Sequence, residues 1–464
     1  MMKFELDELL SATGGEPVGG PAKGYPGVTI DTRRVRPGEL FVAIRGERFD
    51  GHHFVDDAVA AGAGAVVVSD RRFLPRKGGA VVVADTRRAL GDLAATLRAR
   101  LSCRVVAVTG SNGKTTVRSM LASLAAGRWR TVEAEANYNN DIGVPLTVFR
   151  LDESSEVGVF EVEMNENGGT RRLAQVCRPS VGVVTNVGDS HLEMMGDRDG
   201  VAREKAELLE ELPADGVAVL NADDPLVVAI GRKYARCRQV TFGLERPADV
   251  TATDIVAHGL AGTSFRLNDR LAVRLAVPGR HNVANALAAC AAAAELGLPF
   301  AAMPAVLGLF ETAPGRLRVR RLGNNVTLID DSYNANPQSM TAAIDLLCRN
   351  APEGKRVAFL GDMLELGSIA MEAHTRLGVR AVNCLDRVSF VGRLSQHALA
   401  VAIRQGLAAG RVRLYPDSVS AAAGAVDMVR PGDTILVKGS HSVGMELIVK
   451  TLLEHHGEEP NQVH

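Results

Sequence analysis

The sequence has few aromatic residues and no excess of either charge. Aromatic residues make up 4% of the 464 residues, and Trp129 is the single tryptophan, so we expect cores built from aliphatic side chains. Lys and Arg number 53 against 54 Asp and Glu, which gives a formal net charge of -1. Proteins that bind nucleic acid or anionic membranes through a general positive field are strongly basic. The composition therefore predicts neither kind of partner.

Long apolar runs are also missing. No stretch approaches the roughly 18 uninterrupted apolar residues of a membrane-spanning helix. The first residues, Met-Met-Lys-Phe-Glu-Leu-Asp-Glu, include acidic side chains and no long apolar segment, unlike a secretory signal. We therefore expect a cytoplasmic protein.

The cysteines are few and widely spaced. None of the six forms a Cys-x-x-Cys pair, the spacing typical of small metal and redox sites. We therefore expect all of them to be small buried apolar side chains. They are Cys103, Cys177, Cys237, Cys290, Cys348 and Cys384.

The length and the apolar content indicate a folded protein of several domains. Hydrophobic residues make up 46% and charged residues 23%, as in ordinary globular proteins. At roughly 150 residues per domain, the length predicts about three domains. Ala313-Pro314-Gly315 interrupts the pattern of elements and marks one boundary. We expect domains at residues 1–100, 101–314 and 315–464.

Short apolar runs alternate with helical stretches, which indicates an α/β protein built on parallel sheets. The first range is a smaller, mixed α/β domain. The alternation in the second predicts a central mononucleotide-binding sheet, with a hairpin at 263–267 and 271–275. The third predicts a C-terminal Rossmann-like domain. The apolar runs expected to be its strands are 326–330, 357–360, 387–391, 411–415 and 434–438.

The segment 109–116 has the features of a phosphate-binding loop. It follows an apolar run and opens a helix, and its glycines allow backbone N–H groups to converge on phosphate oxygens. Lys114 is placed for the β- and γ-phosphates, and Thr115 for Mg²⁺. Since Val108 occupies the first glycine position of the strict pattern, an ordinary strand–turn–helix stays an alternative. The loop residues are Thr109, Gly110, Ser111, Asn112, Gly113, Lys114, Thr115 and Thr116.

This loop is similar to that of the Mur ligase family, the ATP-dependent amide ligases of peptidoglycan precursor synthesis. The resemblance covers about residues 27–445, with motifs in all three expected domains. It implies ATP and Mg²⁺ as cofactors, with two ions expected. It also implies a role in cell-wall biogenesis, and through it in cell shape and cell division.

Further motifs imply a metal site beside the loop. Glu161 follows an apolar run and resembles the family's metal-binding acid. Glu163 stands where the family has a glycine, and it is either a surface acid or an extra charge near the metal. His191 resembles the family's magnesium-binding histidine, and Lys205 the lysine that the family carbamylates. By themselves these two would be a structural histidine and an exposed helical lysine. The implied metal shell is Thr115, Glu161, His191 and a carbamylated Lys205.

The resemblance also implies nucleotide contacts outside the loop. Asn282 and Asn285 open an alanine-rich helix and resemble nucleotide-side residues, although Asn282 also fits a helix cap. Arg316 matches an arginine that reaches the ATP phosphates from the third domain. Asp330 and Asp331 begin the string at 330–340 and are placed near ATP or the amine. With Lys114, Glu161, His191 and Lys205, Arg316 completes the expected catalytic set.

Three segments are similar to substrate-binding parts of the family. The first lies in the UDP-binding region, where surface charges on a turn are the alternative. The second faces the UDP-sugar-peptide, where a cluster of turns is the alternative. The third follows an apolar run in the last domain and is expected to hold the incoming dipeptide. The residues are Asp31, Thr32 and Arg33; Asn137, Asn139 and Asn140; and Asn334 and Asn336.

The string at 330–340 distinguishes between members of the family. It resembles the member that adds D-alanyl-D-alanine, whereas the diaminopimelate- and lysine-adding members carry a histidine-containing string. We expect an ADP-forming ligase that joins this dipeptide to UDP-N-acetylmuramoyl-tripeptide through an acyl phosphate, as a monomer. Alternatives are another Mur-type ligase, including a folylpolyglutamate-type enzyme, a P-loop ATPase switch, and a nucleotide-binding protein without catalysis. The third residue of the tripeptide, diaminopimelate or lysine, stays open.

Overall fold

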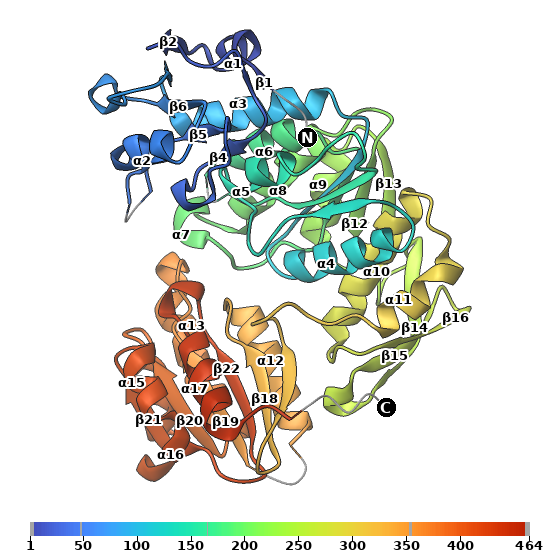
Figure 1. Cartoon of the computed structure of the whole chain (residues 1–464). Helices are drawn as coiled ribbons and strands as arrows, with labels where there is room; N and C mark the ends of the chain where they lie inside the picture. The colour runs from blue at the N-terminus through green and yellow to red at the C-terminus, as the bar shows by residue number, and fades with distance from the viewer. Residues whose placement is uncertain (1–3, 47–48, 165, 352–354, 460–464) are drawn as a thin grey trace.

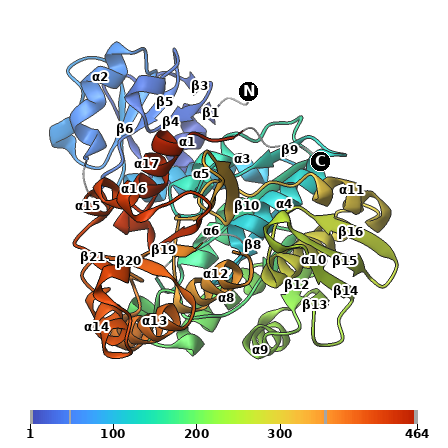
Figure 2. The same ribbon diagram turned by 90° about the horizontal axis from the view of Figure 1, so that it is seen from below.

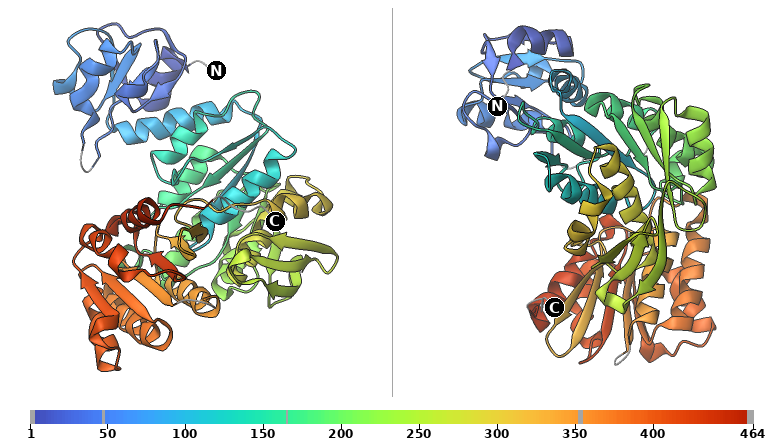
Figure 3. Two further views of the ribbon diagram at one scale, coloured as in Figure 1. Left: turned by 60° about the horizontal axis from the view of Figure 1, so that its bottom comes forward. Right: turned by 90° about the vertical axis from the view of Figure 1, so that its right-hand side faces the viewer.

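The computed structural model describes residues 4–46, 49–164, 166–351 and 355–459. Within these residues the chain forms three larger sheets of five, nine and six strands. Each sheet, with its helices, makes a separate lobe, and the central lobe lies between the other two (Figure 1; Figure 3). This arrangement confirms the predicted α/β class with three domains, whereas the domain boundaries to the residue stay predictions.

The N-terminal lobe is the smallest and rests on the central lobe through one helix. Leu90, Leu93 and Leu97 of this helix, α3 (Thr86–Ala99), belong to one apolar cluster with Ala107 and Phe160 of the central sheet. The five-stranded sheet has the order β2-β7-β6-β5-β4, with β2 (Glu16–Val18), β4 (Val28–Thr29), β5 (Leu40–Val42), β6 (Ala65–Val68) and β7 (Ala80–Val82). The other elements are β1 (Phe4–Glu5), β3 (Gly24–Tyr25), α1 (Leu6–Thr13) and α2 (Val55–Ala60).

The central sheet is parallel over seven strands and ends in an antiparallel hairpin. The predicted hairpin is confirmed, and Asn268 and Asp269 at its turn have φ of 50° and 59°, as a type I′ turn requires. The strands are β8 (Arg104–Thr109), β9 (Thr131–Glu133), β10 (Val157–Glu161), β11 (Val181–Val184), β12 (Val217–Asn221), β13 (Arg238–Gly243), β14 (Val250–Ala257), β15 (Thr263–Leu267) and β16 (Leu271–Leu275). Their order is β16-β15-β14-β13-β12-β11-β8-β10-β9.

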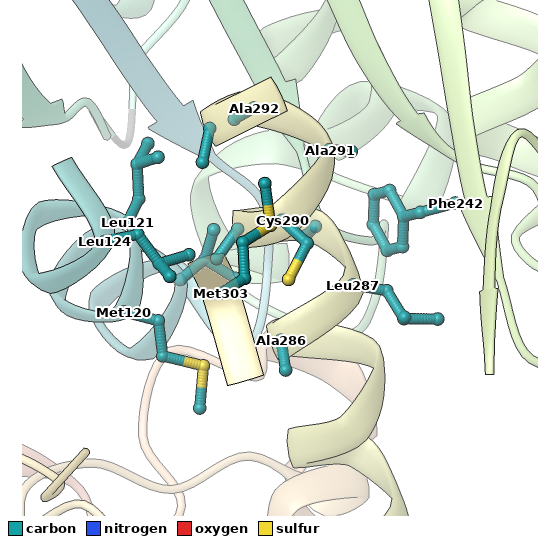
Figure 4. Close-up of a cluster of buried hydrophobic side chains, with 14 of the residues drawn as sticks. Met120, Leu121, Leu124, Phe242, Ala286, Leu287, Cys290, Ala291, Ala292 and Met303 are labelled. Atoms are coloured by element: carbon teal, nitrogen blue, oxygen red, sulfur yellow. The ribbon is translucent and has the colours of Figure 1, made fainter. Parts of the chain in front are cut away.

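Two helices of the central lobe fix the geometry around the phosphate loop. Figure 4 shows Met120 and Leu124 of α4 (Lys114–Ala126) packed against Cys290 of α10 (Arg280–Glu295). The many alanines of α10 let the two helices approach closely, and the buried cluster is mainly aliphatic, as the composition predicted. The other helices are α5 (Gly143–Val148), α6 (Gly169–Cys177), α7 (Leu192–Met195), α8 (Arg198–Glu210), α9 (Pro225–Tyr234) and α11 (Met303–Gly308).

The C-terminal lobe has the predicted doubly wound arrangement, with helices on both faces of its sheet (Figure 2), and its five predicted strands are all present (Figure 1). An antiparallel edge strand, β17 (Arg318–Leu322), is added to them. The others are β18 (Val326–Asp331), β19 (Arg356–Gly361), β20 (Arg387–Val391), β21 (Val412–Tyr415) and β22 (Thr434–Lys438), in the order β17-β18-β22-β19-β20-β21. The helices are α12 (Pro337–Arg349), α13 (Ala370–Cys384), α14 (Gln396–Arg404), α15 (Ser418–Ala423), α16 (Ala425–Met428) and α17 (Glu446–His456).

Two of the cysteines depart from the sequence prediction. Cys348 and Cys384 form a disulfide, with their Cα atoms 5.9 Å apart, between the ends of α12 and α13. The expectation of six separate buried thiols is therefore wrong for this pair. The two residues are 36 positions apart, and the packing of both helices on one apolar cluster brings them together. No local spacing pattern records such a contact.

Among the described residues, no helix combines the length and the apolar content needed to cross a bilayer.

Candidate functional site

A cavity of about 480 Å³ lies between the central and C-terminal lobes. It is at the carboxyl ends of parallel strands, the usual position of ligand sites in open α/β sheets. Many of the residues predicted from sequence line it, although they come from segments up to 225 residues apart. These are Ser111, Asn112, Gly113, Lys114, Thr115, Thr116, Asn139, Glu161, Asn282, Asn285, Arg316, Asp331, Asn334 and Asn336.

The phosphate loop has a backbone that requires glycine at two positions. Gly110 and Gly113 have φ of 140° and 84°. A Cβ at Gly110 would collide with the Thr185 side chain, and one at Gly113 with Asn285. The hydroxyl of Thr185 also donates to the carbonyl of Asn112 over 2.6 Å. The neighbouring strand β11 and helix α10 therefore brace the loop at the start of α4, and it is more than an ordinary strand–turn–helix.

Thr115 is a meeting point of the two lobes. Its hydroxyl donates to the Glu161 carboxylate over 2.9 Å, and it accepts a hydrogen bond from the Arg316 guanidinium over 3.2 Å. The side-chain amide of Asn139 donates to Glu161 Oε1 over 2.9 Å. Arg118 Nη1 lies 3.7 Å from Glu161 Oε2, the oxygen that Thr115 contacts. Arg316 is a residue of the C-terminal range, so the structure brings it to the phosphate loop as the sequence predicted.

Glu163 is surrounded by three cationic groups. Its Oε1 lies 2.7 Å from Lys114 Nζ, 3.3 Å from His191 Nε2 and 3.5 Å from Lys205 Nζ. Burial opposes ionisation of this carboxyl, but Lys114, Lys205 and His191 outweigh burial and hold its pKa well below the usual range. Of the two sequence interpretations, the extra charge beside the predicted metal residues agrees with the structure, and the surface acid does not.

Lys205 lies in the interior, and the alternative of an exposed helical lysine is wrong. Its side chain has 0% exposure, and its Nζ lies 2.6 Å from the carboxylate of Glu204. Burial lowers the pKa of this amine, but Glu204 and Glu163 raise it to a larger extent, so the net shift is upward. Glu204 is itself buried and accepts a hydrogen bond from the Thr170 hydroxyl.

His191 contacts both lobes through its two ring nitrogens. Nε2 faces Glu163 of the central lobe, while Nδ1 lies 2.5 Å from Glu365 Oε2 of the C-terminal lobe. Burial lowers the pKa of this imidazole, but the two carboxylates outweigh burial and raise it to about 9. The backbone of His191 is left-handed, with φ of 53°.

The predicted metal residues form two adjacent groups. Thr115 contacts Glu161, whereas His191 and Lys205 both contact Glu163. In the part of the chain that is described, no group of three or more His, Cys, Asp or Glu side chains is close enough to hold a metal ion as it stands. The donors nevertheless suit Mg²⁺, because the buried Glu161 and Thr115 offer hard oxygen atoms beside the phosphate loop.

Asp330 and Asp331 hold the turn that carries Arg316. Asp330 accepts from the backbone N–H of Gly315 over 3.2 Å, and Asp331 from that of Leu317 over 3.0 Å. Asp331 also pairs with Lys438 over 2.6 Å and lines the cavity, whereas Asp330 does not line it. The guanidinium of Arg316 stacks 4.0 Å above the Tyr333 ring, so this turn is fixed from several sides.

The predicted nucleotide-side asparagines are buried and contact each other. The amide of Asn285 donates to the side-chain oxygen of Asn282 over 3.0 Å, and Asn282 donates to the carbonyl of Pro278 over 2.8 Å. Asn282 is therefore tied to its own helix start, and both residues still line the cavity.

The predicted dipeptide residues lie where α12 meets the phosphate loop. Asn336 caps α12 by accepting from the backbone of Ser339, and its amide donates to the Asn112 side chain over 2.7 Å. The side-chain oxygen of Asn334 accepts from its neighbour, the backbone N–H of Ala335.

The other predicted substrate residues lie outside the cavity lining, except Asn139. Asn140 accepts from the backbone N–H groups of Ile142 and Gly143 just before α5, while Asn137 is exposed. In the N-terminal lobe, Asp31 caps the short helix Thr32–Arg34 and pairs with Arg33 over 2.8 Å. The structure does not bring Asp31, Thr32 and Arg33 to the cavity. A ligand that contacts both this segment and the cavity must therefore extend from the N-terminal lobe to the central lobe.

Sequence reasoning missed several residues of the site. Tyr333 lay inside the string at 330–340, and Glu365 inside Gly-Asp-Met-Leu-Glu-Leu-Gly at 361–367, but neither received a role. The signal was present, because each follows a strand of the C-terminal sheet. Lys438, Gln338 and His441 line the cavity as well. These three residues reach the cavity only because the two lobes pack together, and local sequence patterns do not predict that packing.

The comparisons with known proteins agree along the whole chain. The Mur ligase family, catalytic domain, matches residues 25–101; the Mur ligase middle domain matches 108–293; the Mur ligase, glutamate ligase domain, matches 315–441. The UDP-N-acetylmuramoyl-tripeptide–D-alanyl-D-alanine ligase of Escherichia coli strain K12 is 39% identical, over 98% of this chain and 99% of that protein.

Two solved structures with similar folds are both named MurF. The chain superposes on MurF from Acinetobacter baumannii with a TM-score of 0.87 and 31% identity, covering 98% of this chain and 99% of the other. MurF ligase from Thermotoga maritima, solved in complex with ADP, gives a TM-score of 0.79 and 28% identity, covering 92% and 97%. With these matches in all three lobes, the chain belongs to the Mur ligase family.

Proposed function

We propose that this chain is the ADP-forming ligase that joins D-alanyl-D-alanine to UDP-N-acetylmuramoyl-tripeptide. The names of its relatives support the reaction, and the fold they share extends over nearly the whole chain. The observation that carries the proposal is the contact between Arg316 and Thr115. It brings a cation of one lobe to the phosphate loop of another, at the cavity where a carboxylate and an amine would have to meet.

The reaction needs ATP because a carboxylate is a poor acyl donor. Transfer of the γ-phosphoryl group to the tripeptide carboxylate gives an acyl phosphate; the dipeptide amine attacks its carbonyl carbon, and phosphate leaves. Negative charge develops on the phosphoryl oxygens during the first step. Lys114 and Arg316 are the cations placed to stabilise it, since both lie at the loop and both line the cavity.

Mg²⁺ would be held by the two groups of residues beside the loop. Thr115 and Glu161 form one, and His191 with a carbamylated Lys205 the other. Bound there, Mg²⁺ neutralises charge on the phosphate oxygens. Carbamylation would turn the Lys205 ammonium into an anion next to Glu204 and Glu163, so the modification requires a cation nearby. We infer that carbamate and metal are gained together.

The substrates would extend across all three lobes. We place the uridine diphosphate near Asp31, Thr32 and Arg33, and the peptide end near Asn137, Asn139 and Asn140. The dipeptide lies near Asn334 and Asn336, and the nucleotide lies between the loop and the segment containing Asn282 and Asn285. That Asp330 contacts ligand as well as the Arg316 turn stays a prediction, as do the cytoplasmic location and the monomeric state.

Dependence of ATP cleavage on both other substrates tests this proposal. Phosphate release should require UDP-N-acetylmuramoyl-tripeptide and D-alanyl-D-alanine together, because the amine consumes the acyl phosphate. Release that proceeds at the same rate with ATP alone would instead favour a P-loop ATPase switch. Binding of ATP without any release in the complete mixture would favour a nucleotide-binding protein.

A further inference from the structure

A loop of the C-terminal lobe reaches into the central lobe beside the predicted metal residues. The loop follows β19, and its Glu365 places Oε2 2.5 Å from His191 Nδ1. The carbonyl of Glu365 also accepts from the backbone N–H of Glu193 over 3.2 Å, and Gly367 packs against the backbone of Glu193. Three contacts therefore hold this loop against the segment that begins at His191.

The contact continues into the reaction site. His191 Nε2 lies 3.3 Å from Glu163 Oε1, and the same oxygen lies 2.7 Å from Lys114 Nζ. A chain of charged side chains thus connects the C-terminal loop with the phosphate loop. It runs from Glu365 through His191 and Glu163 to Lys114. Glu365 is the one member of this chain that the C-terminal lobe supplies.

The backbone at both ends of the contact is unusual. Glu365 and His191 have φ of 61° and 53°, a left-handed conformation that non-glycine residues seldom adopt. Such a conformation persists only where surrounding contacts determine it, and such positions gather at functional sites. The side chain of Glu365 is 52% exposed, so it contributes little to a core. Its geometry serves the contact with His191.

We propose that Glu365 is a positioning residue that orients His191 when the C-terminal lobe is docked. A carboxylate on Nδ1 fixes the plane of the ring, so that Nε2 faces Glu163, the carboxylate that also pairs with Lys114. The inference rests on the proposed function and goes beyond it, because it assigns to the lobe contact a second task besides delivering Arg316. Without Glu365, the docked lobe would still deliver Arg316, but the imidazole would be free to turn.

The test compares Glu365→Ala, Glu365→Gln and the control Glu454→Ala. Glu454 is an exposed acid of the same lobe, on α17, with an i,i+4 partner in Lys450. Glu365→Ala should lower kcat about 10- to 100-fold, as loss of an outer partner of a metal-binding histidine does, with KM for ATP changed less than threefold. Glu365→Gln should recover most of kcat, because its amide oxygen still accepts from Nδ1–H. The control should match the wild type.

Two further measurements separate positioning from a structural role. His191→Ala combined with Glu365→Ala should be no slower than His191→Ala alone, since the glutamate acts through the histidine. In protein labelled with ¹⁵N-histidine, Glu365→Ala should change the ring signals of His191 and leave those of the distant His455 unchanged. Wild-type kcat in Glu365→Ala, multiplicative losses in the double variant, or unchanged His191 signals would each overturn the proposal. Failure of the wild type to ligate would instead overturn the proposed function.

Discussion

At the residue scale, the charged side chains of the ligand-free site pair with one another. Lys114 lies 2.7 Å from Glu163 and donates to the Gly110 carbonyl over 2.7 Å. These contacts hold Lys114 at the loop, where phosphate oxygens of a bound nucleotide would replace the Glu163 carboxylate as its partner. The same reasoning applies to Arg316, which contacts Thr115 and the Tyr333 ring.

Lys114→Ala should lower kcat about 10³-fold or more, because the cation that faces the developing phosphoryl charge is lost. The midpoint of thermal unfolding should change little, since Lys205 and His191 still compensate Glu163. Turnover with all three substrates and a thermal melt are the measurements, with the exposed Lys450→Ala as the control. Near-normal ligation by Lys114→Ala would show that the phosphate-loop assignment is wrong.

His191 predicts a pH dependence of stability in metal-free protein. Its folded-state pKa is raised to about 9, above the unfolded value of about 6.5. The protonated imidazole therefore stabilises the fold fully below about pH 6.5, and this contribution is lost as the pH rises through about 9. The wild type should exceed His191→Ala in free energy of unfolding by about 1–3 kcal/mol at pH 6. Urea titrations at pH 6 and pH 9.5 would disagree with this if the difference between the proteins stayed constant.

At the scale of elements, helix ends hold the lobes in place. The guanidinium of Arg98 is buried at the end of α3 and donates to the carbonyls of Leu101, Cys103, Cys177 and Arg178. It thereby joins the end of α3 to the end of α6 and the start of β8. The same kind of junction occurs at α12 and α13, where a disulfide connects the helix ends.

Arg98→Ala should lower the free energy of unfolding by about 2–4 kcal/mol, because three buried carbonyls and one partly buried carbonyl lose a charged donor. Arg98→Lys should recover only part of this loss, since an ammonium cannot reach all four in the planar arrangement of a guanidinium. Arg88→Ala, at an exposed position of the same helix, is the control for urea unfolding. Equal stability of Arg98→Ala and this control would contradict the role of Arg98.

The disulfide predicts four free thiols rather than six in denatured, unreduced protein, as a thiol titration would count. Cys348→Ser should lower the free energy of unfolding by about 2–4 kcal/mol under non-reducing conditions, because the cross-link restricts the unfolded chain. A reductant should bring the wild type to the stability of the variant. A count of six thiols would mean that the pair is reduced.

Many elements could be predicted from sequence, and two of the strands that could not, β14 and β17, have identifiable physical reasons. The strand β22 has the predicted bounds, and the helix α4 follows the glycine turn as predicted, because consecutive apolar residues and the glycine turn determine them locally. β14 was missed because a bulge between Thr253 and Val256, with Asp254 at φ of 50°, breaks its alternation. β17 was missed because three of its five residues are arginines, which suit an edge strand.

At the scale of the whole molecule, the site depends on how the lobes pack together, and this packing could not be predicted from the sequence. Local patterns identified the phosphate loop and Arg316, but the contact between them belongs to the packing of two lobes. The surroundings of Glu163 could not be predicted from local patterns either, because its three cationic partners come from three separate segments of the central lobe. The site is therefore complete only where the central and C-terminal lobes meet.

Mass measurement of the product from a panel of amines shows directly which amine this enzyme adds. The enzyme, ATP, Mg²⁺ and UDP-N-acetylmuramoyl-tripeptide are incubated with D-alanyl-D-alanine, D-alanine, L-lysine or diaminopimelate. We expect the product mass to contain the added dipeptide. The kcat/KM for D-alanyl-D-alanine should be about 10-fold or more above that for D-alanine, because D-alanine leaves buried polar groups near Asn336 unpaired. Comparable kcat/KM for L-lysine or diaminopimelate would contradict the account.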